Sequence, residues 1–181
     1  LTDARAIEAM ERAMYDPLTR LPNRVLFRDR LATARAARDR VTTPAVLFVD
    51  LDGFKRINDS MGHHAGDELL TDVSLRLSCL VRPGDLVARH GGDEFTVLLQ
   101  AIESVLEAES VARRIISGLE DPFTVGGQQC HIGASIGIAI DAGDDQADLV
   151  AQADYAMYAA KQAGRGRFAV FNATRITQNM D

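Results

Sequence analysis

The chain has 181 residues, of which 46% are hydrophobic and 25% are charged, as is ordinary for a soluble globular domain. The net charge of −6 argues against binding to a nucleic-acid backbone, which needs a basic face, so we expect no nucleic-acid partner. No run approaches the ~18 apolar residues of a membrane-spanning helix, and we expect no membrane contact by this segment.

The two cysteines, Cys79 and Cys130, lie far apart in the sequence and form no CxxC pair. We expect buried, reduced thiols and a cytoplasmic location. The length predicts one domain, over residues 15–171, with short flanking segments. We interpret residues 1–14 as a linker helix from an upstream region and residues 172–181 as the start of a C-terminal linker.

The first third of the chain predicts two helices and a strand. Pro17 ends the helix over 1–14, because proline disfavours helix at the residue before it. A second helix is predicted from Pro22 to Arg40, with Pro22 in its first turn. The continuous apolar run Ala45–Val49 predicts a buried central strand.

The middle of the chain predicts a short helix through Ser60, a long helix over 67–81 and a hairpin over 85–100. The long helix has apolar residues at spacings of three and four. The hairpin has arms at 86–88 and 95–99, with a turn at Gly91-Gly92.

The last third predicts a helix, a hairpin, a further helix and a final strand. Ser104 and Glu107 form the pattern of a capping box for a helix over 104–119. A second hairpin joins 123–125 to a strand over 130–140, and the last helix and strand cover 148–163 and 168–171. The order of the core is strand, helix, two strands, helix, strand. We therefore expect an α+β, ferredoxin-like, palm-type βαββαβ sheet flanked by helices, with an added hairpin and terminal helices.

Two pairs of acidic residues are candidates for chemistry. Asp50 and Asp52 directly follow the buried strand, and carboxylates are ligands that Mg²⁺ prefers. Asp93 and Glu94 follow the Gly91-Gly92 turn, where backbone can approach a ligand closely. If the hairpin pairs with the 45–49 strand, Asp50 and Asp93 can share a metal.

Each pair also has a structural explanation. A strand-ending acidic cap explains the first pair equally well, and a soluble turn explains the second. An EF-hand is excluded, because Phe54 and Lys55 occupy the positions that need Asp or Asn and Gly. The chain has no P-loop and no Gly-x-Ser-x-Gly motif, and the four histidines lack zinc-site spacing.

Residues 91–95 read GGDEF. This motif resembles the signature of the GGDEF-domain family, the diguanylate cyclases that condense two GTP into cyclic di-GMP. Further motifs of that family occur in the same order, namely DPLTRLPNR at 16–24, DLDGFKRIND at 50–59, Gly62-His63, Gly66-Asp67, and Asp154, Tyr158, Lys161 and Gly164-Arg165 near the end. The resemblance covers about residues 16–171. Arg20 departs from it, because the family usually has Gly there, and Asp93 stands where many members have Glu.

The resemblance implies a metal site and a catalytic turn. Asp50, the Leu51 carbonyl, Asp93 and Glu94 would hold Mg²⁺ or Mn²⁺ on the triphosphate. Asp93 and Glu94 would be the catalytic residues, and the sequence does not decide whether Glu94 binds metal or removes the 3′-hydroxyl proton.

The resemblance also implies a GTP site. Asn58 and Asp67 would read guanine, since a carboxylate accepts from the ring N–H and the amino group of guanine, whereas adenine has an acceptor at that ring nitrogen. The backbone of Gly53, Phe54, Gly91 and Gly92 would lie against phosphate. Lys55, Lys161 and Arg165 would neutralise phosphate charge. Both lysines among the 20 basic residues fall at these positions, where a compact ammonium suits a point contact.

Arg82 and Asp85 match the R-x-x-D inhibitory motif of the family, which binds the product. Arg82 can donate a fork of hydrogen bonds to a phosphate or a guanine edge. A helix C-terminus with a favourable cation is the alternative explanation.

The resemblance implies homodimerisation, because the 3′-hydroxyl of each GTP attacks the α-phosphate of the other. Other domains of the same chain are further expected partners, including an EAL phosphodiesterase domain. Two functions stay open at this point: an active diguanylate cyclase, or a catalytically silent module that binds GTP or cyclic di-GMP and regulates a neighbouring domain.

Overall fold

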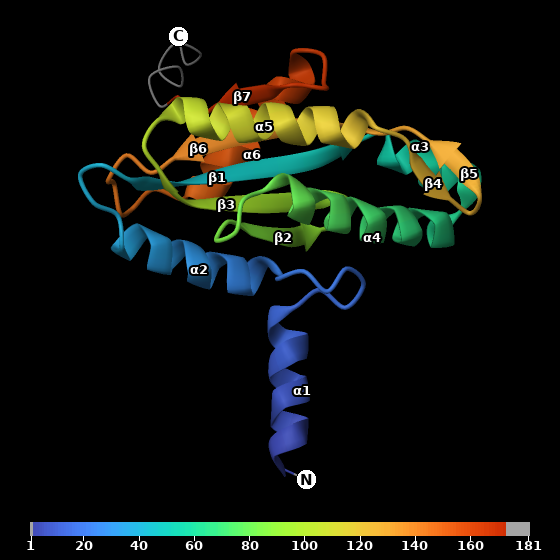
Figure 1. Ribbon diagram of the computed structural model, residues 1–181, viewed down its shortest axis with the longest axis horizontal. Helices are drawn as coiled ribbons and strands as arrows, with labels where there is room; N and C mark the ends of the chain where they lie inside the picture. The colour runs from blue at the N-terminus through green and yellow to red at the C-terminus, as the bar shows by residue number, and fades with distance from the viewer. Residues whose placement is uncertain (1, 173–181) are drawn as a thin grey trace.

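The centre of the molecule is β1 (Thr43–Asp52), whose residues from Pro44 to Leu51 are all buried. It pairs antiparallel with β3 (Glu94–Ile102) on one side and with β6 (Gly133–Ile140) on the other. Beyond these lie β2 (Leu86–Gly91), antiparallel to β3, and β7 (Phe168–Val170), parallel to β6. The resulting order β2-β3-β1-β6-β7 in the computed structural model, which describes residues 2–172, confirms the expected α+β, ferredoxin-like fold (Figure 1).

Helices cover both faces of this sheet. On one face, α4 (His63–Leu80) and α5 (Val105–Glu120) pack on a core of aliphatic and aromatic residues. On the other face, α2 (Arg24–Ala36) and α6 (Leu149–Gln162) enclose a second, smaller core. These four predicted helices are therefore present, and the sheet separates them into two pairs.

Alternation along β1 decides which side chains meet which helices. Leu47 and Val49 belong to the core under α4 and α5, and Val46 and Phe48 belong to the core under α2 and α6. Because successive side chains of a strand point to opposite faces, Asp50 points to the side of α2 and α6. This parity places an acidic residue next to the helix that ends in Lys161.

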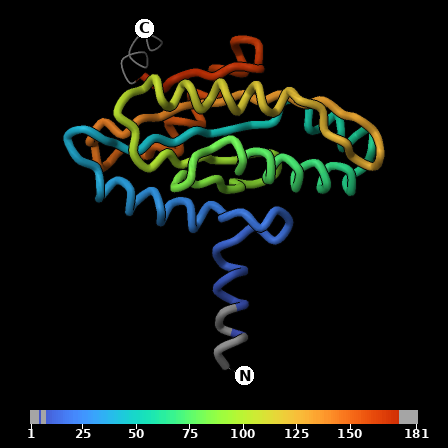
Figure 2. Tube along the Cα trace, viewed as in Figure 1, coloured from blue at the N-terminus to red at the C-terminus, as the bar shows by residue number. Residues whose placement is uncertain are grey.

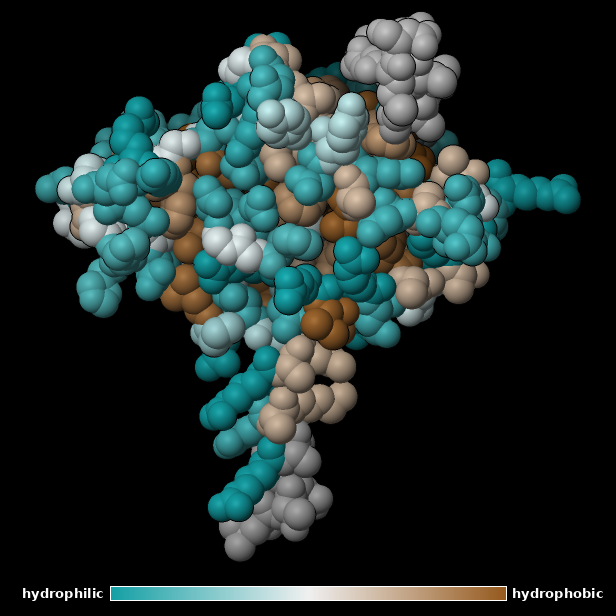
Figure 3. Space-filling model, turned by 180° about the vertical axis from the view of Figure 1, so that it is seen from behind, coloured by the Kyte–Doolittle hydropathy of each residue, from teal (hydrophilic) through white to brown (hydrophobic). Residues whose placement is uncertain are grey.

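Three smaller units lie outside these layers. The helix α3 (Phe54–Met61) follows β1 directly, and the two-stranded sheet of β4 (Phe123–Val125) and β5 (Gln128–Cys130) lies at the same end of the molecule (Figure 1). The helix α1 (Thr2–Met14) projects away from the rest of the chain (Figure 2). In the space-filling view, hydrophilic residues line one side of the coloured part of the projecting helix and more hydrophobic residues the other (Figure 3).

Several predicted boundaries are wrong by a few residues. The helix α2 begins at Arg24 and not at Pro22, because the Asn23 side chain caps it by accepting from the backbone N–H groups of Val25 and Leu26. The same helix ends at Ala36, four residues before the predicted Arg40. The hairpin turn consists of Gly92 and Asp93, since Gly91 still pairs with Glu94 across the strands.

Three other local predictions are corrected by tertiary packing. The predicted strand over 130–140 is two strands. β5 pairs only with β4, and β6 joins the main sheet from Gly133 onward. The Ser104 side chain caps no backbone N–H of α5. The Glu107 carboxylate accepts from the backbone N–H of Glu103 at 2.8 Å, so only one of the two hydrogen bonds of a capping box is present, and its donor is one residue earlier than predicted. Cys130 is buried as expected, but Cys79 is exposed on α4, and both are free thiols.

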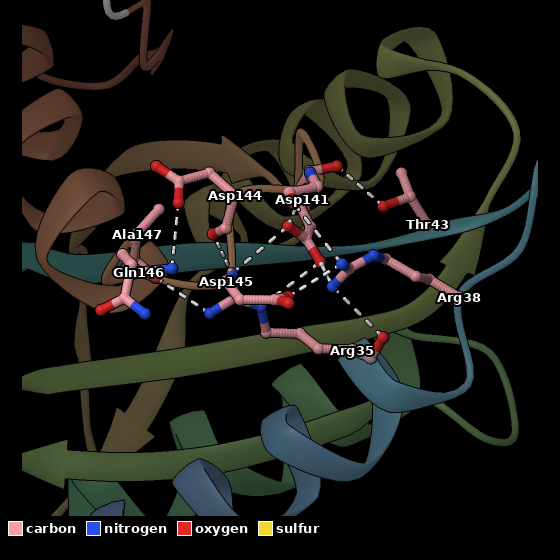
Figure 4. A network of polar contacts seen from close by, with 9 residues as sticks. Arg35, Arg38, Thr43, Asp141, Asp144, Asp145, Gln146 and Ala147 are labelled. Carbon is pink, nitrogen blue, oxygen red and sulfur yellow. Dashed lines mark hydrogen bonds and ion pairs between the residues drawn. The ribbon is translucent and has the colours of Figure 1, made fainter.

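A network of ion pairs closes the end of the sheet where β1 begins (Figure 4). The Asp141 carboxylate is fully buried and pairs with Arg35 in the last turn of α2 at 3.3 Å and with Arg38, just after that helix, at 3.1 Å. The Thr43 hydroxyl donates to the Asp141 carbonyl at 2.8 Å. Asp141 therefore ties the end of α2 and the start of β1 to the loop that leads into α6, so both β1 and α6 begin at a fixed point.

Within residues 2–172, no helix is both long enough and apolar enough to cross a membrane. The predicted C-terminal linker lies outside the described residues except for Asn172.

One buried hydroxyl predicts a stabilising substitution. Thr96 on β3 is fully buried between Phe48 and Ala88, and its Oγ1 has no hydrogen-bond partner. Since an unsatisfied buried hydroxyl costs free energy, Thr96→Val should raise the free energy of unfolding by about 1 kcal/mol. Urea denaturation measures this, with the exposed Thr124→Val on β4 as a control that should change little. A destabilised Thr96→Val would show that the hydroxyl is satisfied in solution.

Candidate active site

The two predicted acidic pairs meet at one edge of the sheet. Asp50 lies directly opposite Glu94 in the register of β1 and β3, and the Leu51 N–H donates to the Asp93 carbonyl at 3.2 Å. The expectation that the hairpin pairs with the central strand is confirmed. Asp50 lies within β1 rather than beyond its end, so the strand itself holds its backbone rigid.

The helix α6 brings a cation to this edge. Lys161, in the last turn of α6, places its Nζ 2.7 Å from Asp50 Oδ1. The helix lies close to β6 because residue 137 is glycine: a Cβ there would be 1.8 Å from the Ala153 carbonyl oxygen and 2.2 Å from the Met157 nitrogen. Gly137 thereby sets the distance from the sheet at which Lys161 meets Asp50. The structure thus pairs Lys161, predicted to contact phosphate, with a predicted metal ligand.

Asp52 anchors the loop that follows α6. Its carboxylate accepts from the Ser135 hydroxyl at 2.9 Å and from the Gly166 N–H at 3.0 Å. Arg165 of the same loop has its Nε 3.9 Å from Asp52 Oδ1, and its backbone has a φ of 59°, which is unusual for arginine. Asp52 therefore positions the exposed guanidinium of Arg165 beside the acidic edge.

Burial and repulsion from neighbouring carboxylates raise the pKa of two acids at this edge, Asp50 and Glu94. Burial raises the pKa of Asp50, and the charges of Asp93 and Asp52 raise it further, while Lys161 opposes the rise. Burial also raises the pKa of Glu94, with added repulsion from Asp50, Asp154 and Asp93. Carboxylates that disfavour each other's ionisation form a site that a cation stabilises.

The donor set fits a hard divalent cation that also binds phosphate. Within residues 2–172, no group of three or more His, Cys, Asp or Glu side chains is arranged to hold a metal ion. Mg²⁺ does not need such a group, because it is commonly held by one or two carboxylates together with substrate phosphates and water. Asp50, Asp93 and the Leu51 carbonyl supply oxygen ligands of this kind. In the structure, the ammonium group of Lys161 pairs with Asp50.

The predicted guanine-reading residues lie at the junction of α3 and α4. Gly53 begins α3 with a φ of 87°, and Gly62 joins the two helices with a φ of 88°. Asn58 packs against Gly66, where an added Cβ would be 1.8 Å from Asn58 Oδ1. That oxygen is buried and has no hydrogen-bond partner, and the exposed Asp67 is the next residue after Gly66. The junction therefore places Asn58 against the residue that precedes Asp67.

The remaining predicted phosphate contacts lie on exposed turns near the acids. Lys55 is exposed in the first turn of α3, whose first backbone N–H groups follow Gly53. Gly91 and Gly92 are exposed at the tip that carries Asp93.

The predicted inhibitory pair lies away from this edge, where α4 ends and β2 begins. Arg82 Nε is 3.2 Å from Asp85 Oδ2, and the Asp85 side chain is 2% exposed. The two residues of the motif therefore contact each other in this structure.

A model of the family described as diguanylate cyclase, GGDEF domain, matches residues 13–167. The chain belongs to the GGDEF-domain family.

Similar proteins and solved structures support this family assignment. The chain is 44% identical over 171 residues to the bifunctional diguanylate cyclase/cyclic di-GMP phosphodiesterase MucR of Pseudomonas aeruginosa, a match that covers 92% of this chain and 25% of MucR. It is 44% identical over 172 residues to the diguanylate cyclase TpbB of the same organism, covering 92% of this chain and 40% of TpbB. The solved GGDEF domain of TpbB has a TM-score of 0.82 at 40% identity, covering 91% of this chain and 99% of that one.

A further solved structure contains the product of the family. The coiled coil and GGDEF domain of DgcB from Caulobacter crescentus, in complex with c-di-GMP, has a TM-score of 0.82 at 27% identity and covers 93% of this chain and 91% of that one. The chain spans 25% of the length of MucR and 40% of that of TpbB.

The tip of the GGDEF turn is held by residues to which the sequence assigns no role. Arg89 donates to both carboxylate oxygens of Asp16 at 3.1 Å and, from Nε and Nη2, to the Gly92 carbonyl at 3.0 and 2.8 Å. Asp16 also accepts from the Thr19 N–H and hydroxyl, each at 2.8 Å. The opening motif of the family thus positions the residue that precedes Asp93. Asp16 was visible in that motif, but nothing in the sequence pairs it with Arg89.

Three more residues near the site have no clear sequence signal. The ring of His90 packs edge-on against Phe48 with 5.0 Å between centroids, and burial with nearby Arg24 and Arg28 lowers its pKa. Asp154 on α6 opposes that shift and raises the pKa of Glu94. Ser135 faces Asp52 only because β6 pairs with β1.

Arg20, where the GGDEF family usually has glycine, adopts a φ of 62°. The left-handed conformation costs a residue with a Cβ roughly 1 kcal/mol, which explains the glycine of the family. The turn keeps its shape here because the Arg20 N–H donates to the Asp16 carbonyl at 2.9 Å.

The anchor at Asp16 predicts a pH-dependent contribution to stability. Burial alone would raise the pKa of Asp16, but the hydrogen bonds from Thr19 and Arg89 outweigh it, and the pKa is lowered. A lowered pKa stabilises the folded state above the unfolded value of about 3.9, and the gain is lost as the pH falls through the folded value. We expect Asp16→Asn to cost about 1 kcal/mol at pH 7 and progressively less below pH ~4.

Urea denaturation at several pH values measures this difference. The exposed Asp29→Asn on α2 removes the same charge without the anchor and should change stability little at any of them. An equal loss for Asp16→Asn at pH 7 and below pH ~3.5 would contradict the assignment.

Proposed function

We propose that this domain is an active diguanylate cyclase, which condenses two GTP into cyclic di-GMP and releases pyrophosphate. The observation that carries the proposal is the register of β1 and β3, which sets Asp50 opposite Glu94 and beside Asp93 in a chain that the family model matches over residues 13–167. Cations reach the same edge from α6 and the loop after it, as a triphosphate requires.

Recognition of guanine rests on the junction of α3 and α4. Asn58 Oδ1 is buried without a partner, so a donor from the base would satisfy it and recover the cost of its burial. Asp67 would accept from the ring N–H and the amino group of guanine. Adenine has an acceptor at that ring nitrogen, so the pair favours GTP over ATP.

The triphosphate would lie between the start of α3 and the end of α6. The backbone N–H groups of Gly53 and Phe54 would donate to phosphate oxygens, since the first N–H groups of a helix lack partners within it. Lys55, Lys161 and Arg165 would neutralise phosphate charge. Lys161 would then exchange its contact with Asp50 for one with phosphate.

Asp50, Asp93, Glu94 and the Leu51 carbonyl would hold Mg²⁺ or Mn²⁺, which supplies charge neutralisation at the α-phosphate and at the leaving pyrophosphate. In each half-reaction a bond forms between the 3′-oxygen of one GTP and the α-phosphorus of the other. The bond from that phosphorus to pyrophosphate breaks, and the 3′-hydroxyl loses its proton. Asp93 and Glu94, next to the exposed Gly91 and Gly92, would act on this hydroxyl.

One domain with one GTP cannot form a product with two-fold symmetry, so two copies would meet with their turns facing each other. The projecting α1 suits a role in that encounter, because Met10 is 61% exposed and apolar residues gather on one side of the helix (Figure 3). We further propose that this domain acts in the cytoplasm and that other domains of the same chain control the encounter, as MucR combines two activities.

Arg82 and Asp85 would bind the product and lower the rate. DgcB was solved with c-di-GMP, and this chain presents an arginine and an aspartate in the matching motif, beside a cavity of about 360 Å³ lined by both of them and Val81, Pro83 and Val87. The guanidinium would donate to a phosphate and the carboxylate would accept from guanine N–H groups.

Removal of either metal-binding carboxylate tests the activity. Asp50→Ala and Asp93→Ala should each abolish conversion of GTP with Mg²⁺, measured by chromatography, while circular dichroism shows an intact fold. The matched control Asp29→Ala should retain turnover. Full turnover by either site variant would contradict the metal assignment. A wild-type domain that binds GTP or cyclic di-GMP without turnover would instead be a silent regulatory module.

Removal of the Arg82 fork tests the inhibitory site. Arg82→Ala should weaken binding of cyclic di-GMP, measured by calorimetry, by at least about tenfold, because hydrogen bonds to a charged group contribute roughly 1.5–3 kcal/mol. The concentration of cyclic di-GMP that halves the rate should rise in parallel. If Arg82→Ala binds cyclic di-GMP as tightly as the wild type, or if the wild type does not bind it at tens of micromolar, the proposal is wrong. Arg82 and Asp85 would then only mark the end of a helix.

A further inference from the structure

The guanidinium of Arg82 is engaged on every nitrogen. Its Nε pairs with Asp85, its Nη1 lies 3.7 Å from Glu107 Oε2, and its Nη2 donates to the Ala101 carbonyl. Asp85 follows in the same turn, Ala101 belongs to β3 and Glu107 to α5. Arg82 is therefore held by three segments, and a phosphate that binds it has to compete with a carboxylate that is not part of the inhibitory motif.

Glu107 is fixed in place by a second contact. While Oε2 faces Arg82, Oε1 accepts from the Glu103 N–H at 2.8 Å, just before α5 begins. The capping bond keeps the carboxylate at the mouth of a cavity of about 220 Å³ between α5 and β3. Arg82, Asp85 and Arg114 line the same cavity. Arg114 directs its Nε to the Leu80 carbonyl at 2.6 Å.

The cavity is lined by two carboxylates and two guanidinium groups. Asp85 and Glu107 both face the guanidinium of Arg82, whereas Arg114 donates to the Leu80 carbonyl. Asp85 is complementary to guanine N–H donors, whereas Glu107 has no donor to meet on a phosphodiester and would repel it. Glu107 is exposed enough, at 40% of its side chain, to act on a ligand that approaches from solvent.

We propose that Glu107 sets the affinity of the inhibitory site for its anionic dinucleotide, by holding Arg82 in its closed arrangement and repelling the incoming phosphate. The inference rests on the proposed inhibitory site at Arg82 and Asp85. The expected size of the effect is about fivefold in affinity, as for one exposed charge about 4 Å away in water.

Glu107→Gln is the appropriate variant, because the amide oxygen still accepts from the Glu103 N–H and only the charge is lost. The control is Glu109→Gln, which removes the same charge from the same helix, where Glu109 pairs with Arg113 at 3.0 Å. Calorimetry with cyclic di-GMP should show about fivefold tighter binding for Glu107→Gln and little change for Glu109→Gln. In an Arg82→Ala background, Glu107→Gln should have no such effect, since the two residues act on the same ligand.

Each outcome is decisive. Unchanged or weaker binding by Glu107→Gln, with measurable binding by the wild type, would overturn the role of Glu107 and leave the inhibitory site intact. Equal tightening by both variants would attribute the effect to overall charge and also overturn it. No binding by any variant, Glu107→Gln included, would remove the inhibitory site itself and the inference with it. Turnover of GTP is measured separately, so none of these results bears on the cyclase activity.

Discussion

The structure depends on one electrostatic constraint, the crowding of carboxylates where β1 ends. Asp50 and Glu94 are directly opposite each other on adjacent strands, a pairing of like charges that destabilises a sheet unless it is compensated. Lys161 compensates it at 2.7 Å, and Ser135 and Gly166 hold the neighbouring Asp52. Burial, together with repulsion between the neighbouring carboxylates, raises the pKa of Asp50 and of Glu94. Under the proposed function, this crowding of carboxylates would serve a site for cations and the phosphates bound to them.

The rest of the sheet holds this edge in place. Gly137 allows α6 to lie directly on β6, and the buried Asp141 fixes the start of both β1 and α6 at the far end of the sheet. Both β1 and α6 run from that end of the sheet to the acidic edge. Lys161, in the last turn of α6, therefore lies beside Asp50 of β1. A Cβ at residue 137 would push α6 outward and separate the pair, although residue 137 touches neither of them.

The GGDEF turn is coupled to the segment from which α1 projects. Arg89 joins Asp16 to the Gly92 carbonyl, so a displacement of the turn after α1 reaches the residue next to Asp93 through one side chain. The proposed inhibitory site lies at Arg82, whose guanidinium contacts Asp85, Glu107 and the Ala101 carbonyl. Arg89 and Arg82 thus contact the same hairpin through different strands, since Arg89 lies on β2 and Ala101 on β3. The proposed control by an upstream segment and the proposed inhibition by product would therefore act on this hairpin at separate places.

Local patterns in the sequence determined the existence and order of the helices and strands, the βαββαβ core and the motifs of the site. Those signals are short in range: apolar spacing marks α4, and an apolar run followed by acids marks β1. Contacts between distant segments were decided only by the tertiary structure. Lys161 faces Asp50, Arg89 joins Asp16 to Gly92, and Glu107 holds Arg82, yet none of these pairings has a local signature. The split of the 130–140 strand and the half-formed capping box have the same origin. A side chain's partner is set by the register of strands and by the distance at which helices pack on them, and both depend on the whole core at once.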